Sequence, residues 1–301
     1  MISEVYILGR GLAGTATAAI LAQAGLRVTI VGPEWVRPGG PSYLWSTPST
    51  HTYLKNTLGI QDPRVRLVKV GYWEGWWVQR PSGQHIKTYT QVTGRVESVP
   101  SMTEGRSSIL VHQVPTSALQ AMADDLVRRS PNCRVINKRV RSIETDHGCV
   151  VSIDEDIPIR DRAAVVVAIP LPIFSRLVGV DPIVEYSPVA FGTVDRRDLG
   201  FWWTESFDYA YTYCPSWAPF YRVTNNRDGT FGVEFDPSHA EWVERVGATV
   251  AAVQTPGRLV PIQGTFPNTI QVGRMARGDR SRLSDTIEQA QKLITVEGDL
   301  W

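Results

Sequence analysis

The stretch EVYILGRGLAGTATAAILAQAGLRVTIV, residues 4–31, decides the fold of this chain. Residues 4–8 are a short apolar run that ends at a glycine, and residues 12–24 are small and apolar at helical spacing. Residues 27–31 form a second, β-branched run. A strand, a glycine-rich turn, a helix and a strand within about 30 residues make a βαβ unit, so we expect the two strands to be parallel.

The turn inside this unit has the spacing of a phosphate-binding loop. Gly9, Gly11 and Gly14 form G-R-G-L-A-G between the first strand and the helix. The first glycine permits the tight turn, the second lets the backbone approach a pyrophosphate, and the third lets the helix pack on the strand. Leu12 and Ala13 begin the helix, whose N-terminal amides and dipole favour an anion. The motif therefore predicts a bound dinucleotide.

The second strand departs from the usual dinucleotide-binding pattern. It normally ends in an acidic residue that binds the ribose hydroxyls, but that position is Gly32 here, and Glu34 lies two residues further on. Either a longer loop brings Glu34 to the ribose, or the ribose is recognised more weakly.

The bulk composition is that of a globular protein. The chain has 301 residues, 43% hydrophobic and 20% charged, with a formal net charge of +1. This charge balance argues neither for nor against a nucleic-acid partner. The three cysteines have no metal-ligand or redox spacing, so we expect reduced thiols and a cytoplasmic protein. No apolar run reaches membrane-spanning length, and we expect no metal site.

The rest of the chain alternates helix–strand blocks with β-rich blocks. Residues 33–63 read as a long loop, 64–100 as antiparallel strands, and 115–129 as an amphipathic helix. We predict an α/β fold in which a Rossmann-like dinucleotide-binding domain is interleaved with a smaller β-rich, α+β substrate domain. The first comprises residues 1–68, 108–180 and 258–301, and the second comprises 69–107 and 181–257.

Four motifs, in their order along the chain, resemble those of FAD-dependent amine oxidases, a superfamily that includes protoporphyrinogen oxidases and UDP-galactopyranose mutases. They are VYILGRGLAG at 5–14, RPGG at 37–40, RVRSI at 139–143 with VVVAIPLP at 165–172, and IQVGRMARGDRSRLSDTIEQA at 270–290. The resemblance covers about half the chain and implies FAD as the cofactor of the Rossmann-like domain. A proline, Pro41, stands where the family has an arginine.

The resemblance also implies where FAD is held. The backbone of Gly39 and Gly40 would pass the ribityl-pyrophosphate, and the main chain of Val140 would contact the adenine. Gly273 and Arg274 would lie beside the pyrophosphate. The start of a helix would point at the flavin, with the residues Leu283, Ser284, Asp285 and Thr286.

The substrate side rests on the aromatic stretch TYCPSWAPFYRVTN, 212–225, which resembles the family's strand over the flavin. From it we predict Tyr213, Tyr221 and Arg222 as substrate-binding or catalytic residues. His51 follows the loop with the glycine pair, where the resemblance implies side chains near the flavin, so we predict it as a fourth catalytic candidate. Strict alternation puts Tyr221 and Arg222 on opposite faces unless a bulge intervenes.

Three functions are compatible with these motifs. The first is an FAD-dependent oxidoreductase that oxidises the C–N bond of a small or nucleotide-linked amine by hydride transfer to flavin N5. The second is a mutase that uses reduced flavin on a nucleotide sugar without net redox change. The third is a flavoenzyme acting on a modified base or nucleotide in DNA, with an Arg-rich tail for backbone contact and tryptophans for stacking. A non-enzymatic scaffold also stays open, because fold does not imply function.

Overall fold

The computed structural model describes most of the predicted dinucleotide-binding domain and part of the β-rich domain. The described residues are 4–34, 43–73, 77–78, 82–84, 86–87, 108–180, 184–186, 189–195, 209–213, 220–226, 229–236, 241, 249–254, 257–259, 266–273 and 283–295.

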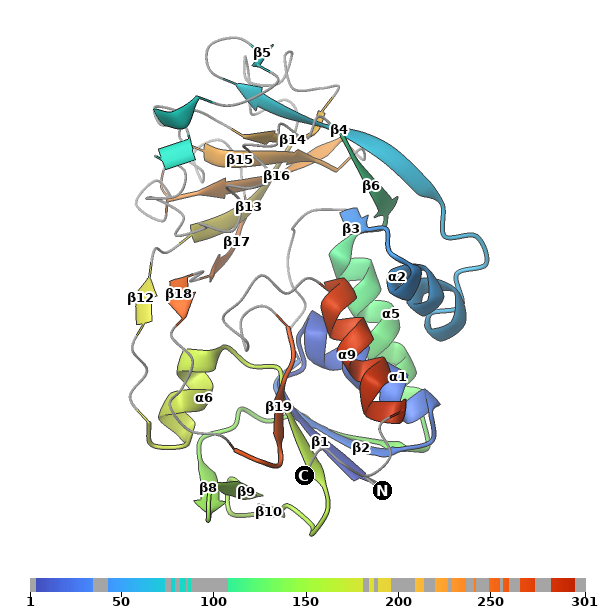
Figure 1. Ribbon diagram of the computed structural model, residues 1–301, viewed down its shortest axis with the longest axis vertical. Helices are drawn as coiled ribbons and strands as arrows, with labels where there is room; N and C mark the ends of the chain where they lie inside the picture. The colour runs from blue at the N-terminus through green and yellow to red at the C-terminus, as the bar shows by residue number, and fades with distance from the viewer. Residues whose placement is uncertain are drawn as a thin grey trace.

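A parallel five-stranded sheet forms the lower part of the molecule in Figure 1. Its strand order is β19-β11-β1-β2-β7, and all four pairings are parallel. The strands are β1 (Glu4–Leu8), β2 (Arg27–Val31), β7 (Cys133–Ile136), β11 (Ala164–Val167) and β19 (Thr269–Gln271). The residues of β11 are all buried, as expected of a strand covered on both faces.

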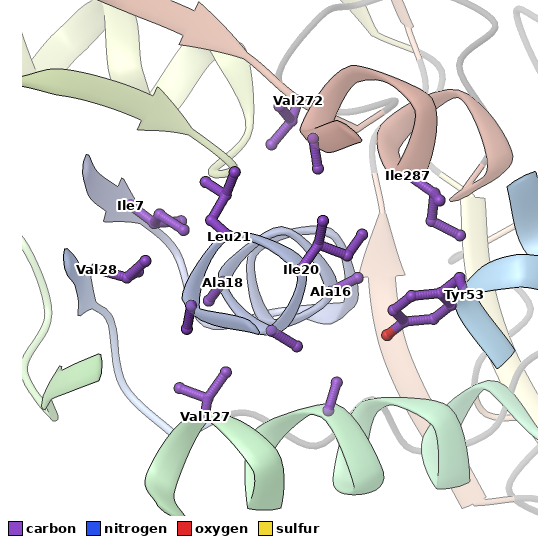
Figure 2. Close-up of a cluster of buried hydrophobic side chains, with 14 of the residues drawn as sticks. Ile7, Ala16, Ala18, Ile20, Leu21, Val28, Tyr53, Val127, Val272 and Ile287 are labelled. Atoms are coloured by element: carbon purple, nitrogen blue, oxygen red, sulfur yellow. The ribbon is translucent and has the colours of Figure 1, made fainter. Parts of the chain in front are cut away.

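Helix α1 (Leu12–Gln23) is buried along most of its length, because its small residues let neighbours pack closely all round it. It lies between α5 (Thr116–Arg129) and α9 (Leu283–Thr295), and it packs on the sheet (Figure 1). Figure 2 shows this core around α1: Ile7 and Val28 come from the sheet, Val127 from α5 and Ile287 from α9. The short helix α6 (Leu171–Leu177) follows β11 directly.

A nine-stranded sheet forms the upper part of the molecule (Figure 1). Its order is β17-β13-β16-β15-β14-β4-β6-β3, with β5 paired to β4. These strands are β3 (Tyr43–Trp45), β4 (Val65–Trp73), β5 (Trp77–Val78), β6 (Ser108–Gln113), β13 (Val189–Asp195), β14 (Tyr209–Tyr213), β15 (Phe220–Asn225), β16 (Thr230–Phe235) and β17 (Thr249–Gln254). Two small sheets complete the described strands: β8 (Ile143–Asp146), β9 (Cys149–Ile153) and β10 (Ile157–Pro158), and the pair β12 (Val184–Tyr186) and β18 (Gly257–Leu259).

The predicted fold class, a Rossmann-like α/β domain interleaved with a β-rich one, is confirmed. The domain bounds stay a prediction. Strands β3 and β6 lie within the ranges we assigned to the dinucleotide-binding domain, yet they pair in the nine-stranded sheet.

One local prediction is wrong. The expected loop over 33–63 contains β3, helix α2 (Pro48–Thr52) and a π-helical turn η1 (Tyr53–Thr57). The overlooked signal is Thr47 before Pro48: the Thr47 side chain accepts from the Thr50 amide in a capping box, and proline is well suited to the first helical turn. The antiparallel strands expected over 64–100 are present, since β4 pairs antiparallel with β5 and β6, and β4 also pairs in parallel with the distant strand β14.

Among the described residues, no helix is long and apolar enough to cross a membrane. The same part of the chain contains no cluster of three or more His, Cys, Asp or Glu side chains that could hold a metal ion. Burial raises the pKa of the Cys133 thiol to about 11, so this cysteine is a packing residue rather than a reactive one.

Candidate dinucleotide-binding site

The parallel sheet reverses its strand order at β1. The chain proceeds from β1 to β2 and β7 on one side, and it returns to β11 and β19 on the other. In open α/β sheets the crevice at such a reversal, outside the carboxyl ends of the strands, is where ligands bind. The G-R-G-L-A-G turn leaves β1 at this point.

The turn is closed by two glycines that admit no side chain. Gly9 has a φ of 104°, and a Cβ there would lie 2.8 Å from Cγ2 of Ile169. Its amide donates to the Val31 carbonyl at 2.8 Å. A Cβ on Gly14 would lie 1.9 Å from the Gly9 carbonyl oxygen, so α1 contacts the turn backbone to backbone. Both glycines are required for the close packing that a dinucleotide-binding turn needs.

The N-terminus of α1 opens from this turn. Gly11 is its N-cap residue, with extended backbone at φ −81° and ψ −176°, and Leu12 and Ala13 begin the first turn. Among the described residues no side chain caps this end by a hydrogen bond, and the first turn has no acidic residue. The first amides of a helix lack intrahelical acceptors, so this N-terminus suits an anionic pyrophosphate.

The C-terminal segment returns to the same turn. Gly273, two residues after the end of β19, has a φ of 82°, and a Cβ there would lie 2.7 Å from the Cβ of Ala13. Within α9, Ser284 and Thr286 are buried in the first turn and Ile287 is wholly buried against the core. One face of α9 is therefore part of the core. The Cβ on Gly273 would also lie 3.9 Å from Oγ1 of Thr286, so Gly273 lies between the start of α1 and the first turn of α9. Leu283 and Asp285 belong to that first turn.

Arg10, which the sequence analysis did not single out, lies inside the turn. Its guanidinium donates twice to the Asp124 carboxylate of α5, Nε to Oδ1 and Nη2 to Oδ2, each at 2.6 Å. Burial raises the pKa of Asp124, but hydrogen bonds from Arg10 and Arg128 lower it more, so the net pKa is below the ordinary value. The two residues are 114 positions apart, so no local sequence signal could have identified this pair.

Glu34 lies on the loop after β2, and the reason for its displacement is steric. A Cβ on Gly32 would lie 2.7 Å from the Arg10 amide nitrogen, so no acidic side chain fits at that position. The Glu34 amide donates to Oδ1 of Asn137 at 2.9 Å, and its carboxylate pairs with Arg128 at 2.7 Å. A pocket of about 300 Å³ separates this loop from α5. It is lined by Arg10, Glu34, Gln120, Ala121, Asp124, Asp125 and Arg128.

His51 is an exposed residue of α2, and its ring centroid lies 5.7 Å from that of the buried His112. Helix α2 also reaches α9, because the Ser49 hydroxyl donates to the Glu288 carboxylate at 2.6 Å. His51 therefore belongs to a helix that packs beside α9. Its predicted position near the flavin stays a prediction.

The predicted substrate residues lie on β14 and β15. Tyr213 is paired with Arg222, so these two share a face. The register of β15 against β16 shifts between Phe220 and Arg222, which makes Tyr221 the extra residue of a β-bulge. The Arg222 guanidinium pairs with the buried Glu234 carboxylate of β16. Arg222 is thus engaged within the sheet, and its role toward a substrate stays a prediction.

The remaining predicted residues are untested. Val140 lies in the loop between β7 and β8, partly buried against the hydrophobic cluster that includes Leu8, Val31 and Ile143. Gly39, Gly40 and Arg274 lie outside the described residues.

No protein-family model matches this chain, and no curated protein matches its sequence. Solved structures do match over nearly its whole length. The p-nitrophenol 4-monooxygenase PnpA from Pseudomonas putida has 16% identity and a TM-score of 0.59, covering 98% of this chain and 78% of that one. A tryptophan halogenase from Shewanella frigidimarina has 12% identity and a TM-score of 0.58, covering 98% and 70%. PqsL, a probable FAD-dependent monooxygenase from Pseudomonas aeruginosa, has 15% identity and a TM-score of 0.54, covering 98% and 85%.

These likenesses establish the fold. The chain has the fold of FAD-dependent monooxygenases, halogenases and related oxidoreductases. They do not separate the amine-oxidase superfamily from these other enzymes.

Proposed function

We propose that this chain binds FAD non-covalently and is an FAD-dependent oxidoreductase. The observation that carries the proposal is the meeting of two distant segments at one turn. The G-R-G-L-A-G turn opens a helix with no side-chain cap among the described residues at the sheet's reversal point, and Gly273, just beyond β19, packs on Ala13 of that helix. A turn for a mononucleotide alone needs no such return from the C-terminus. The fold shared with PqsL supports FAD as the dinucleotide.

The residues present fit FAD at this turn. The amides of Gly11, Leu12 and Ala13 lie at the N-terminus of α1, which no side chain in the described part of the chain caps, and they would bind the pyrophosphate. The N-terminus of α9, whose first turn holds Ser284 and Thr286, would place a positive dipole end toward negative charge on the cofactor. When bound, FAD supplies the redox chemistry. The protein's part is to bind and orient the cofactor and substrate and to exclude water.

The finer proposal, an amine as the electron donor, rests on the motif resemblance alone. The solved structures with this fold include, by their names, enzymes of p-nitrophenol and tryptophan. A phenol or an indole is therefore the second substrate class to test. The two classes differ in what reduces the flavin: the amine itself, or a separate reductant such as a nicotinamide cofactor.

The cofactor test is the visible spectrum of the purified protein, with the released cofactor identified. We expect flavin absorption, release of FAD by denaturation, and rebinding of added FAD. Gly11→Val should abolish the uptake, because a side chain there occupies the approach to the pyrophosphate. Gly83→Ala is the matched control, since a Cβ at Gly83 meets nothing within 4 Å. A colourless protein that does not take up FAD would contradict the proposal.

The substrate test is anaerobic bleaching of the bound flavin. We expect a panel of small and nucleotide-linked amines to bleach it without a nicotinamide cofactor. Bleaching by NADH or NADPH alone, followed by oxygen-dependent turnover of a phenol or an indole, would replace the amine by the second class.

A further inference from the structure

One ion pair joins the phosphate-binding turn to a helix more than a hundred residues away in sequence. Arg10 lies between the first two motif glycines, and its side chain is 3% exposed. It forms the bidentate pair with Asp124 in the middle of α5, whose side chain is 16% exposed. A paired arginine fork of this kind fixes direction as well as distance, because two parallel hydrogen bonds define a plane.

The turn is held at Arg10 from two other sides. The side-chain amide of Gln120, one helical turn before Asp124, donates to the Arg10 carbonyl at 3.3 Å. On the opposite side, Gly32 leaves only enough space for the Arg10 backbone, since a Cβ there would lie 2.7 Å from the Arg10 nitrogen. Backbone and side chain of Arg10 are therefore both constrained.

The charges continue from Asp124 toward the end of β2. Arg128 Nε donates to the second Asp124 oxygen at 2.8 Å, and its Nη2 reaches the Glu34 carboxylate at 2.7 Å. Two arginines and two carboxylates thus alternate along the wall of the pocket beside the turn, and their charges balance. The Arg10 guanidinium uses the edge formed by Nε and Nη2 for the Asp124 carboxylate, so this edge is turned toward α5 and is not available as a direct phosphate ligand.

We propose that Arg10 and Asp124 are positioning residues for the dinucleotide: their buried pair holds the turn between Gly9 and Gly11 in the shape that presents its amides to the pyrophosphate. This inference rests on the proposed FAD function. Replacing a buried ion pair by an apolar pair of similar volume is often neutral or stabilising. Stability alone therefore does not account for a charged pair at this position, whereas directional fixing of a glycine-rich turn does.

The test compares FAD affinity with thermal stability in the flavin-free protein. FAD is titrated into the wild type, into Arg10→Met, into Asp124→Leu and into the double variant. We expect each single variant to raise the Kd of FAD about tenfold or more, about 1.4 kcal/mol, and to lower Tm. The double variant should recover Tm, because no buried charge is left unpaired, while its Kd stays raised about tenfold. Arg129→Met is the matched control: Arg129 is 78% exposed and pairs with Asp125 on the same helix, so Kd should not change.

The outcomes are distinguishable. Recovery of both Tm and FAD affinity in the double variant would overturn the inference, because the pair would then be structural only. Asp124→Asn provides a second check: weaker FAD binding supports positioning, whereas tighter binding would make Arg10 a direct phosphate contact and overturn it. Absence of FAD binding in the wild type would instead remove the proposed function, and the inference with it.

Discussion

At the residue scale, Gly14 is the least replaceable position in the described turn. Gly14→Ala would place a Cβ 1.9 Å from the Gly9 carbonyl oxygen, which is backbone and cannot rotate away. We expect a loss of about 3 kcal/mol or more in unfolding free energy, at or above the upper range for overpacking, together with loss of FAD uptake. Chemical denaturation and FAD titration check both. Unchanged stability would mean that the turn is more open than described.

For Tyr53 we expect a substitution that raises the unfolding free energy. It is wholly buried in η1, and its hydroxyl has no hydrogen-bond partner among the described residues. Burial raises the pKa of this hydroxyl, so it stays protonated. Removing a buried unsatisfied group relieves a desolvation penalty, and Tyr53→Phe should therefore stabilise the protein by about 1 kcal/mol. The measurement is the urea midpoint, and a lower midpoint would reveal a partner for the hydroxyl.

At the scale of elements, α9 is a structural part of the core around α1. Ile287 is wholly buried against that core, whereas Ile294 on the same helix is 41% exposed. Ile287→Ala should cost about 2–5 kcal/mol, and Ile294→Ala clearly less, because only the first leaves a cavity. The difference between the two unfolding free energies is the test. Equal losses would mean that α9 does not pack on α1 as in Figure 2.

Arg222 on β15 contributes to stability through its ion pair with Glu234 on β16, whether or not it also binds substrate. Its partner Glu234 is 5% exposed, so Arg222→Ala leaves a buried charge without its partner. We expect a loss of about 3–5 kcal/mol in stability. The double variant Arg222→Met/Glu234→Leu should recover most of it, as judged by thermal unfolding. If the double variant folds well, its turnover then tests whether the Tyr213–Arg222 face binds substrate, free of the stability effect.

At the scale of the whole molecule, two buried groups shape the pH dependence of stability. Burial lowers the pKa of His112 below 6.5, and His51 lowers it further, although carbonyls of Arg64 and Pro63 oppose this. Below pH 6.5 the unfolded chain therefore binds a proton that the folded chain does not, and stability falls as the pH falls. Asp124 has a lowered pKa, so its contribution is present above its ordinary value of 3.8 and is lost at lower pH.

A substitution at His112 separates the pH range that it governs from the range governed by Asp124. His112→Gln should flatten the decline that begins near pH 6.5 and leave the decline below pH 3.8 in place. Denaturant unfolding at intervals from pH 8 to pH 3 checks this, since one differential proton changes the slope by about 1.4 kcal/mol per pH unit. A slope between pH 6.5 and 5 that the variant does not alter would assign it to other groups.

Sequence reasoning reached the parts of the site that are local. The G-R-G-L-A-G turn, α1, the amphipathic helix at 116–129, and the strand that ends near Gly273 were predicted in place, because each is set by its own residue spacing. The loop prediction over 33–63 failed at Thr47–Pro48, where proline and serine were read as loop composition and not as a helix start. The bulge at Tyr221 has no local signal.

The sequence by itself determined the βαβ unit and its phosphate-binding turn, since hydrophobic period and glycine spacing act within about 30 residues. Only the tertiary structure decided that Arg10 pairs with Asp124, 114 residues away, and that Gly273 packs on Ala13. It also decided that Gly32 leaves no space for the usual acid, which places Glu34 on the next loop beside Arg128. These contacts depend on how separate elements pack. Packing is a property of three-dimensional surfaces, which no spacing along one segment encodes.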